Sequence, residues 1–465
     1  MTLTTVPHYD SEQIPDRGEH AIVVGAGIAG LCATRVLADA FDEVTVIDRD
    51  PLPDEPVARD GVPQARQIHI LWEAGRATLE DLFPGYSEEL VAAGGVSIDG
   101  QRDFYMYSQG NYLATGSKPF PLYAATRPLY EQLLRQRVSD RDDVYVRGSC
   151  PFVDYLADDA TKNVNGVVIR DQDGGQEEIA ADLVIDATGR MSRTPDWLSN
   201  HGYTPPSAEE VHIDLAYTTT CIERPANDYR MIGVLAAAPR SRGGAVLPVE
   251  DDCWLVNLHG IHGDHPPKNI EDAKDFAASL PIPIVNDLLN EYPMVSEEAA
   301  FYPFPSNRRY RYENLDQFPE GLLVIGDAIA SFNPIYGQGM SVAALEALTL
   351  HHVLTRDNHE PLATSFFNRA TEIIDPAWML ATGADFSFSQ TRGEKPNGAA
   401  FFNWYLSRLF RKAHADGVLT DAFTRVLSMQ QHPTSLLRPS IMWRVLKPGR
   451  RTEQLQPRKP THETT

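Results

Sequence analysis

The stretch AIVVGAGIAGLCATRVLADA, residues 21–40, decides the fold of this chain. Its first four residues are apolar and predict a short buried strand, Ala21–Val24, which a glycine-rich turn follows directly. An apolar helix is predicted from about Ile28 to Ala40, and a second strand at Val44–Ile47. A strand, a crossover helix and a second strand within about 30 residues form the unit from which parallel sheets are built. The sequence therefore predicts an α/β fold with a Rossmann-like domain near its N-terminus.

The turn Gly25-Ala-Gly27-Ile-Ala-Gly30 is typical of a dinucleotide site. Gly25 allows the tight turn, Gly27 lets the backbone approach a pyrophosphate, and Gly30 lets helix and strand pack closely. The free N–H groups at the helix N-terminus then face the anion. Asp48 ends the second strand, where a carboxylate can bind the two ribose hydroxyls. A free ribose indicates FAD or NAD rather than NADP at this site.

A second motif, Gly326-Asp327-Ala328, distinguishes FAD from NAD. It follows a predicted strand, Gly321–Ile325, so Asp327 places a carboxylate at the end of a buried strand, where it can bind a polyol. The ribityl chain of FAD is such a polyol, and NAD has none. The loop Pro334-Ile-Tyr-Gly337-Gln-Gly339 comes next, and its glycines let the backbone pass close to a flat ring. A helix predicted from Met340 to about Leu354 points its N-terminus at that ring, where its dipole stabilises the negative charge of a reduced flavin.

The order of these motifs resembles the single-component FAD monooxygenases of the p-hydroxybenzoate hydroxylase type. The resemblance covers roughly residues 20–350. It implies that Arg49 contacts the adenosine part of FAD and that Arg127 binds near the pyrophosphate. It also implies that Gly337, Gly339 and Met340 lie at the flavin.

Two stretches depart from that family pattern. Asp186-Ala-Thr-Gly189-Arg-Met-Ser192-Arg193 looks like a variant of a family motif that serves both FAD and NAD(P)H, but its usual Asp-Gly pair is missing. The choice between NADH and NADPH, and how either binds, therefore stays open. Gly61-Val-Pro-Gln-Ala-Arg66-Gln-Ile-His69 looks more like the branch that contains polyether and squalene-type epoxidases. Arg66 and His69 lie either near the flavin or in a polar loop that packs on the cofactor domain.

The resemblance implies an enzyme that hydroxylates or epoxidises a small apolar organic substrate. It would use NAD(P)H and O₂ and act through a flavin C4a-hydroperoxide. The alternative is an FAD-dependent reductase or dehydrogenase of a prenyl or polyene chain, similar to geranylgeranyl reductases. Tyr302-Pro-Phe-Pro305 lacks the tryptophan of their motif, which weakens that reading. A third hypothesis, a non-catalytic escort that has lost its flavin, is disfavoured because Asp327 is present.

The catalytic pocket residues are not identified by the sequence. The predicted β-rich layer carries His212, Tyr217, Trp254 and His259 on or near its strands, and each is more often ordinary packing than a catalytic group. Tyr336 is a better pocket candidate because it lies inside the predicted flavin loop.

The domain organisation follows from these motifs and from the composition between them. Helices are also predicted at Leu71–Leu82 and Arg127–Val138, and strands at Val144–Val146, Val167–Ile169 and Leu183–Asp186, with a hairpin turn at Asn165-Gly166. The chain is expected to be α+β overall, with a β-sheet substrate domain inserted into the FAD-binding domain. The predicted segments are a loose N-terminal arm (1–19), the first part of the FAD-binding domain (20–195), the β-rich substrate domain (196–317), the second part of the FAD-binding domain (318–360), a helical C-terminal region (361–446) and a disordered tail (447–465).

Composition limits the partners and the compartment. The formal charge of −23 over 465 residues disfavours nucleic acid. No secretory signal and no apolar stretch long enough to span a membrane is apparent, so a cytoplasmic location is expected. The four cysteines are expected to be unpaired thiols, and no metal site is predicted. The stretch FFNWYLSRLFRK, residues 401–412, is either a helix that touches a membrane surface or, as we favour, one that packs its apolar side on the core. Oligomeric state stays open.

Overall fold

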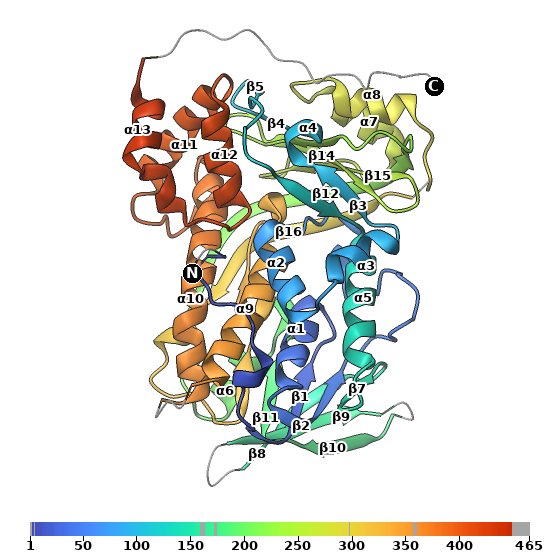
Figure 1. The fold of residues 1–465 in the computed structure, drawn as a ribbon, viewed down its shortest axis with the longest axis vertical. Helices are drawn as coiled ribbons and strands as arrows, with labels where there is room; N and C mark the ends of the chain where they lie inside the picture. The colour runs from blue at the N-terminus through green and yellow to red at the C-terminus, as the bar shows by residue number, and fades with distance from the viewer. Residues whose placement is uncertain are drawn as a thin grey trace.

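A computed structural model gives the structure of residues 2–3, 5–158, 163–171, 174–296, 298–356 and 360–448. The molecule is elongated, with a parallel sheet in its lower half and a large, mainly antiparallel sheet above it (Figure 1). Of the predicted disordered tail, only Lys447 and Pro448 are among these residues, so that prediction lies outside the described part of the chain.

The parallel sheet is built from five short, apolar strands. Its order is β17-β11-β1-β2-β7, and all neighbours run parallel. The predicted β-α-β unit lies at its centre as β1, α1 and β2, so the Rossmann-like prediction is confirmed. The helices α1, α5 and α9 pack together over the sheet. These elements are β1 (Gly18–Val24), α1 (Ile28–Leu37), β2 (Phe41–Ile47), α5 (Arg127–Ser139), β7 (Val144–Arg147), β11 (Leu183–Asp186), β17 (Leu322–Val324) and α9 (Gly339–Leu354).

A three-stranded antiparallel sheet lies at the bottom of the molecule (Figure 1). It comprises β8 (Phe152–Ala157), β9 (Val164–Arg170) and β10 (Gln176–Ala180). The predicted turn at Asn165-Gly166 is wrong, because both residues lie inside β9 and Gly166 pairs with Leu156 and Ala180. Gly166 has a φ of +150°, and a Cβ there would lie 2.1 Å from the carbonyl oxygen of Ile179. This glycine therefore serves a close approach of two strands rather than a turn.

The large sheet draws its strands from distant parts of the chain. Its main path is β18-β16-β12-β15-β14-β13-β4-β5, and β19 pairs with β12. All its described pairs are antiparallel except β13 with β4. Its strands are β4 (Phe104–Ser108), β5 (Asn111–Tyr112), β12 (Ala208–Glu223), β13 (Met231–Val234), β14 (Arg242–Val249), β15 (Cys253–Gly260), β16 (Ala300–Tyr310), β18 (Ala330–Ser331) and β19 (Arg392–Gly393).

The predicted β-rich segment supplies only part of that sheet. Strands β4, β5, β18 and β19 come from outside residues 196–317. The same segment also contains two helices, α7 (Ile270–Ala278) and α8 (Ile284–Glu291), which bury apolar side chains against strands β14 and β15. The predicted domain boundaries therefore do not coincide with the limits of the sheet.

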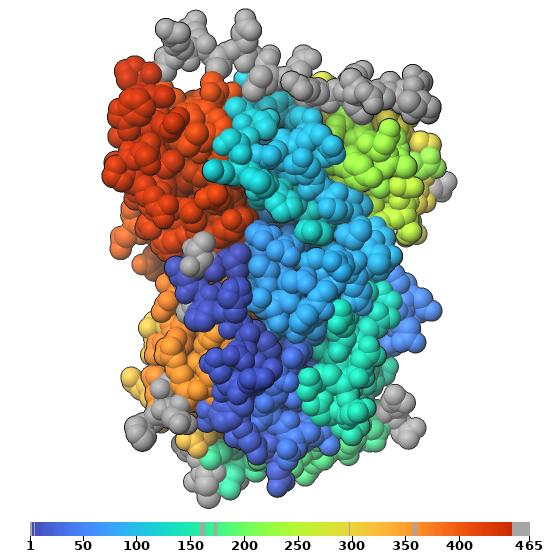
Figure 2. All heavy atoms as spheres, in the orientation of Figure 1, coloured from blue at the N-terminus to red at the C-terminus, as the bar shows by residue number. Residues whose placement is uncertain are grey.

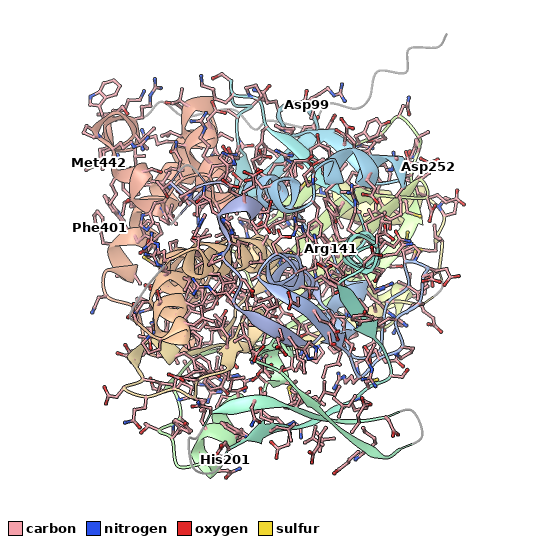
Figure 3. All side chains as sticks on the ribbon, turned by 60° about the horizontal axis from the view of Figure 1, so that its bottom comes forward. Asp99, Arg141, His201, Asp252, Phe401 and Met442 are labelled. Carbon is pink, nitrogen blue, oxygen red and sulfur yellow. The ribbon has the colours of Figure 1, made fainter. Side chains whose placement is uncertain are left out.

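Helices dominate the C-terminal part, as expected. In α11 the side chains of Tyr405, Leu406, Leu409 and Phe410 pack on the core, whereas Phe401 and Trp404 are 55% and 50% exposed. Figure 3 shows Phe401 and Met442 along the same outer edge. The remaining helices and strands are α2 (Glu73–Leu82), α3 (Tyr86–Ala92), β3 (Val96–Asp99), α4 (Gly100–Asp103), β6 (Pro121–Ala124), α6 (Thr194–Asn200), α10 (Leu362–Asp385), α11 (Ala399–Ala413), α12 (Gly417–Leu427) and α13 (Pro439–Leu446).

The N-terminal arm is not loose, so that prediction is wrong. The backbone N–H of Leu3 donates to the carbonyl of Met429 over 3.2 Å, and Val6 is buried. The Arg17 side chain donates to the carbonyls of Leu354 and Arg356 at the C-terminal end of α9. Carbonyls at the C-terminal end of a helix have no partner within the helix and attract a cation. The Arg17 side chain meets this need and holds the polar arm against the fold. In Figure 2 the dark blue arm lies on the surface beside the orange helices.

Candidate functional site

The glycine turn between β1 and α1 is sterically required at two of its three positions. Gly25 has a φ of +111°, and a Cβ there would lie 2.5 Å from the carbonyl oxygen of Ala187. A Cβ at Gly30 would lie 1.9 Å from the carbonyl oxygen of Gly25. Gly27 is less crowded, since its nearest neighbour would be the Arg127 guanidinium at 3.8 Å. The turn thus presents its open side, at Gly27, toward a cation, which suits an anionic ligand.

Asp48 at the end of β2 lies in a buried network of charges. Its carboxylate accepts hydrogen bonds from the backbone N–H groups of Ala26, over 2.8 Å, and Asp50, over 2.9 Å. Arg59 forms an ion pair with Asp48 at 3.0 Å and another with Glu131 at 3.0 Å. Arg59 could not be predicted from the sequence, because it lies in an irregular stretch with no motif around it.

The two arginines predicted from the resemblance have different surroundings. Arg127 begins α5 after the N-cap Thr126, and its guanidinium pairs with Glu131 at 2.7 Å. Burial acts to raise the pKa of Glu131, but Arg127 and Arg59 outweigh it and lower that pKa. Arg49 has a 63% exposed side chain and donates to the carbonyl of Gly61 over 3.2 Å. Arg127 therefore lies at the glycine turn, whereas Arg49 is mainly exposed and forms a long ion pair with the buried Asp50 at 3.9 Å.

Asp327 lies on a short helical turn, η5 (Gly326–Ala328), directly after β17. A Cβ at Gly326 would lie 2.7 Å from the Cβ of Ala29, so the second motif packs on the first turn of α1. The structure thus brings together two motifs that are about 300 residues apart in the chain. Within the described residues, no hydrogen bond or ion pair reaches the Asp327 carboxylate. Its side chain has exposed surface but is closely surrounded by protein, and this desolvation raises its pKa while Arg127 and Arg190 oppose the rise.

The predicted flavin loop is closely packed at Gly337 and open at Gly339. It forms a short turn, η6 (Pro334–Tyr336), and Gly337 follows with a φ of +65°. A Cβ at Gly337 would lie 3.3 Å from both Ile70 and the Trp72 indole nitrogen. At Gly339, where α9 begins, a Cβ would have no neighbour within 4 Å. Met340 is buried. The N-terminus of α9 is therefore accessible, as a ring-binding helix requires.

A buried carboxyl group, that of Glu346 on α9, forms a hydrogen bond to the turn that carries Asp327. Its Oε2 accepts a hydrogen bond from the backbone N–H of Gly326 over 2.6 Å. Its Oε1 has no partner among the described residues. Burial raises the pKa of Glu346 to about 8, and the nearby Asp327 contributes to this rise. No motif in the sequence marks Glu346, because it occupies an ordinary position in an apolar helix.

The variant motif that begins at Asp186 is a closed structural turn. The Asp186 carboxylate accepts hydrogen bonds from the hydroxyls of Thr188, Ser192 and Thr194 at 2.5–2.6 Å. Its acceptors are therefore used inside the protein. Arg190 of the same motif donates to the hydroxyl of Ser306 over 3.0 Å and lies over the Phe304 ring. Burial lowers the pKa of Arg190, and repulsion from Arg308 adds to this effect.

The loop that carries Arg66 and His69 contacts both halves of the molecule. Burial and, second to it, the charge of Arg127 together lower the pKa of His69 to about 4, so His69 lies within electrostatic reach of the glycine turn. The neighbouring Gln67 accepts a hydrogen bond from the Thr219 hydroxyl on β12 over 2.6 Å. Arg66 is exposed. His69 therefore lies toward the candidate site, and Arg66 lies at the surface.

The candidates on the large sheet fall into two groups. His212 is exposed beside Glu210, and Trp254 is buried with its indole N–H on the carbonyl of Arg230 over 3.2 Å, so both are ordinary surface or packing residues. His259 is buried, and its Nε2 has no partner among the described residues. Tyr217 donates to the Asn333 side chain next to the flavin loop over 3.1 Å. Tyr336 lies within that loop and is half-buried.

Comparison with known proteins agrees with this geometry. A family model described as "FAD binding domain" matches residues 19–357. The chain belongs to this FAD-binding family. It is therefore an FAD-dependent oxidoreductase, and two of its relatives are named as monooxygenases.

The chain is similar to three relatives over different shares of its length. The chain is 35% identical to Protein Rv3254 of Mycobacterium tuberculosis over 88% of its length and 90% of the relative. It is 26% identical to a kynurenine 3-monooxygenase of Cytophaga hutchinsonii over 43% of this chain and 45% of the relative. It is 22% identical to squalene monooxygenase 1,1 of Brassica napus over 81% of this chain and 70% of the relative.

A solved structure shares the fold. The flavoprotein/dehydrogenase from Cytophaga hutchinsonii aligns with a TM-score of 0.66 over 91% of this chain and 96% of that one, at 16% identity. The predicted FAD-binding architecture is thus confirmed.

Within the described residues, no group of three or more His, Cys, Asp or Glu side chains could hold a metal ion. The four cysteines are unpaired, and three of them are buried. No described helix combines the length and the apolar character needed to cross a bilayer.

Proposed function

We propose that this chain is an FAD-dependent monooxygenase that hydroxylates or epoxidises an apolar organic substrate, with NAD(P)H as reductant and O₂ as the oxygen donor. The observation that carries the proposal is the Asp327 carboxylate, unpartnered among the described residues, on a turn that contacts α9, the helix whose N-terminus at Gly339 is accessible. FAD has a group to match each feature, because its ribityl polyol can bind the carboxylate and the negatively charged edge of its reduced ring can face the helix N-terminus.

Each predicted binding residue has a role in this proposal. The open side of the glycine turn at Gly27, together with Arg127, binds the pyrophosphate. Asp48 binds the adenosine ribose, and Arg59 holds its carboxylate in place. Asp327 binds the ribityl chain. Arg49 stays a predicted contact to the adenosine part of FAD.

The loop and helix that follow Asp327 receive the ring. Gly337 and Gly339 admit it, and the first turn of α9 from Met340 stabilises negative charge on it. The bound FAD supplies the transfer of electrons from NAD(P)H and the activation of O₂.

An apolar substrate suits the surface next to the loop. Ile68, Ile70 and Tyr336 are half-buried there and pack against the apolar cluster that contains Trp72. A substrate held against these side chains would exclude water from the reacting atoms. Excluding water limits side reactions that would consume NAD(P)H without forming product. No catalytic acid or base is assigned, and a cytoplasmic location stays a prediction.

The test is a spectrum followed by isotope labelling. Purified protein is expected to be yellow, and NADH and NADPH oxidation is compared across a panel of aromatic and polyene substrates. With ¹⁸O₂, the product of the productive pair is expected to carry one labelled oxygen. A reduced or desaturated product without label would instead identify the prenyl or polyene reductase or dehydrogenase. A colourless protein that takes up no flavin on reconstitution would contradict both enzymatic functions.

A further inference from the structure

A buried carboxyl group that the proposed chemistry does not use lies directly behind the flavin loop. Asp385 is the last residue of α10, and it is 4% exposed. Within the described residues, no lysine or arginine forms an ion pair with it. Burying a carboxylate without a cation is unfavourable, so stability of the fold does not explain its presence.

Two asparagine amides supply the hydrogen bonds that Asp385 requires. Its Oδ1 accepts from the Asn333 side-chain amide over 2.8 Å, and its Oδ2 accepts from that of Asn307 over 2.8 Å. The backbone N–H of Asn333 donates in turn to the Asn307 side-chain oxygen. Both asparagines are buried. Three segments, from β16, the loop and α10, are thus joined by one polar cluster.

The cluster determines how the loop begins. The side-chain oxygen of Asn333 accepts from the backbone N–H of Ile335 over 3.1 Å and from the Tyr217 hydroxyl over 3.1 Å. Asn333 is therefore the N-cap of η6. Its amide can point this oxygen into the loop only if its NH₂ group faces an acceptor, and Asp385 is that acceptor.

Two further hydrogen bonds hold the rest of the loop. The Trp72 indole N–H donates to the carbonyl of Tyr336 over 2.7 Å. The Gln338 side-chain amide donates to the carbonyl of Leu427 over 2.9 Å. The loop is thus held at residues 333, 336 and 338, while its other side stays open at Gly339.

A carboxylate differs from an amide at position 385 in a way that can be measured. Asp385 receives donors from both sides, and a carboxylate can accept on both oxygens. An asparagine at position 385 would have to point its own NH₂ group at the NH₂ group of either Asn307 or Asn333, and two donors cannot form a hydrogen bond. The side-chain amide of Asn307 or of Asn333 would then have to rotate by about 180°. A rotated Asn333 would lose the hydrogen bonds that its oxygen accepts from Ile335 and Tyr217.

We propose that Asp385 is a positioning residue that acts through Asn333 to hold the Pro334–Gly339 loop in the conformation that receives the flavin ring. The inference rests on the proposed placement of FAD at this loop. Asp385 itself does not touch the cofactor. Because the contact is indirect, its loss is expected to change the binding and the environment of the flavin without removing a ligand.

The test compares Asp385→Asn with a variant that exchanges the two groups. In the double variant Asp385→Asn, Asn333→Asp, the amide at 385 donates to the new carboxylate, which still accepts from Ile335 and Tyr217. The measurements are the Kd of FAD for apoprotein, the visible absorption and circular dichroism of bound flavin, and apoprotein Tm. We expect Asp385→Asn to weaken FAD binding about tenfold, the loss of one or two hydrogen bonds to a charged group, and to alter the flavin spectrum. The double variant is expected to recover most of the wild-type FAD affinity and most of the wild-type flavin spectrum.

Two controls separate positioning from general stability. Thr382→Val lies one turn earlier in α10 and removes only a buried hydrogen bond to Trp378. It is expected to lower Tm without changing FAD affinity or spectrum. Tyr217→Phe removes one donor to Asn333 and is expected to weaken FAD binding by a smaller factor, about two- to tenfold. It serves as the decisive variant if Asp385→Asn does not fold.

The outcomes are distinct from those that test the enzymatic function. Wild-type FAD affinity and spectrum in Asp385→Asn would overturn the inference, as would a double variant no better than the single one. If Asp385→Asn does not fold, wild-type binding and spectrum in Tyr217→Phe would overturn it. A wild-type protein that binds FAD but inserts no oxygen would contradict the monooxygenase proposal and leave the role of Asp385 measurable.

Discussion

At the scale of single residues, Asp327 offers the most direct test of the cofactor site. Its carboxylate has no partner among the described residues, so its removal costs the apoprotein little. Asp327→Ala removes a charge-assisted hydrogen bond to the ribityl chain, which is worth about 1.5–3 kcal/mol. FAD retention, measured by titration of apoprotein, is expected to fall at least tenfold. Asp316→Ala, at an exposed position, is the control and should bind FAD normally. Unchanged retention in Asp327→Ala would show that another group holds the ribityl chain.

Glu346 makes a second prediction at this scale, through pH. Its pKa is raised to about 8 by burial, whereas an unfolded glutamate ionises near 4.5. The stabilising contribution of such a group is complete below the unfolded pKa and is lost as pH rises through the folded one. Glu346→Gln keeps an acceptor for Gly326 but cannot ionise. Between about pH 5 and pH 8, the variant is expected to gain stability relative to wild type by up to about 1.4 kcal/mol per pH unit. Urea unfolding of both apoproteins measures the difference, and a constant difference would mean that Glu346 is already ionised when folded.

At the scale of elements, two glycines at helix starts separate folding from ligand binding. A Cβ at Gly30 would overlap the carbonyl oxygen of Gly25, at 1.9 Å, whereas a Cβ at Gly339 would meet nothing within 4 Å. Gly30→Ala is expected to destabilise the apoprotein by about 1–3 kcal/mol. Gly339→Ala should leave apoprotein Tm unchanged or slightly higher, because alanine favours helix by up to about 1 kcal/mol, yet it should weaken FAD binding. Thermal unfolding and FAD titration of both variants test this pair. Normal FAD affinity in Gly339→Ala would show that the ring does not approach α9.

Local elements were predictable where their signals were local. The strand before Gly25, the helix after it and the helix that Pro128 opens all follow from short-range patterns. The site residues found only in the structure depend on contacts between distant positions. Arg59 pairs with Glu131, and Asp385 with Asn307, across 72 and 78 residues of chain respectively. No periodicity or motif marks such partners. The strands β4 and β5 were missed for the same reason, since only their neighbour β13 shows which sheet they join.

At the scale of the whole molecule, the formal charge of −23 predicts a response to salt. Self-repulsion among surface carboxylates destabilises the compact state, and raising NaCl from about 0.1 M to 1 M shortens the screening length from about 10 Å to 3 Å. The apoprotein Tm is therefore expected to rise over this range. The ion pairs around the buried Arg59 are screened much less and should not reverse the trend. A Tm that falls with NaCl would show that surface ion pairs outweigh the repulsion. KCl, which has the same ionic strength but a different cation, should give the same curve.

The position of β17 has a consequence for the synthesis of the protein. This strand closes the outer edge of β11, yet it follows it by more than 130 residues in the chain. At a translation rate of about 5–20 residues per second, the nascent polypeptide carries the fully buried segment Leu183–Asp186 without its final neighbour for roughly 7–27 seconds. An unpaired apolar strand edge is a template for association with other chains. The Asp327 turn and the start of α9 leave the ribosome even later, so the flavin cannot bind early enough to protect this edge. Ribosome-bound chains that stop before residue 322 are therefore the species most dependent on chaperones.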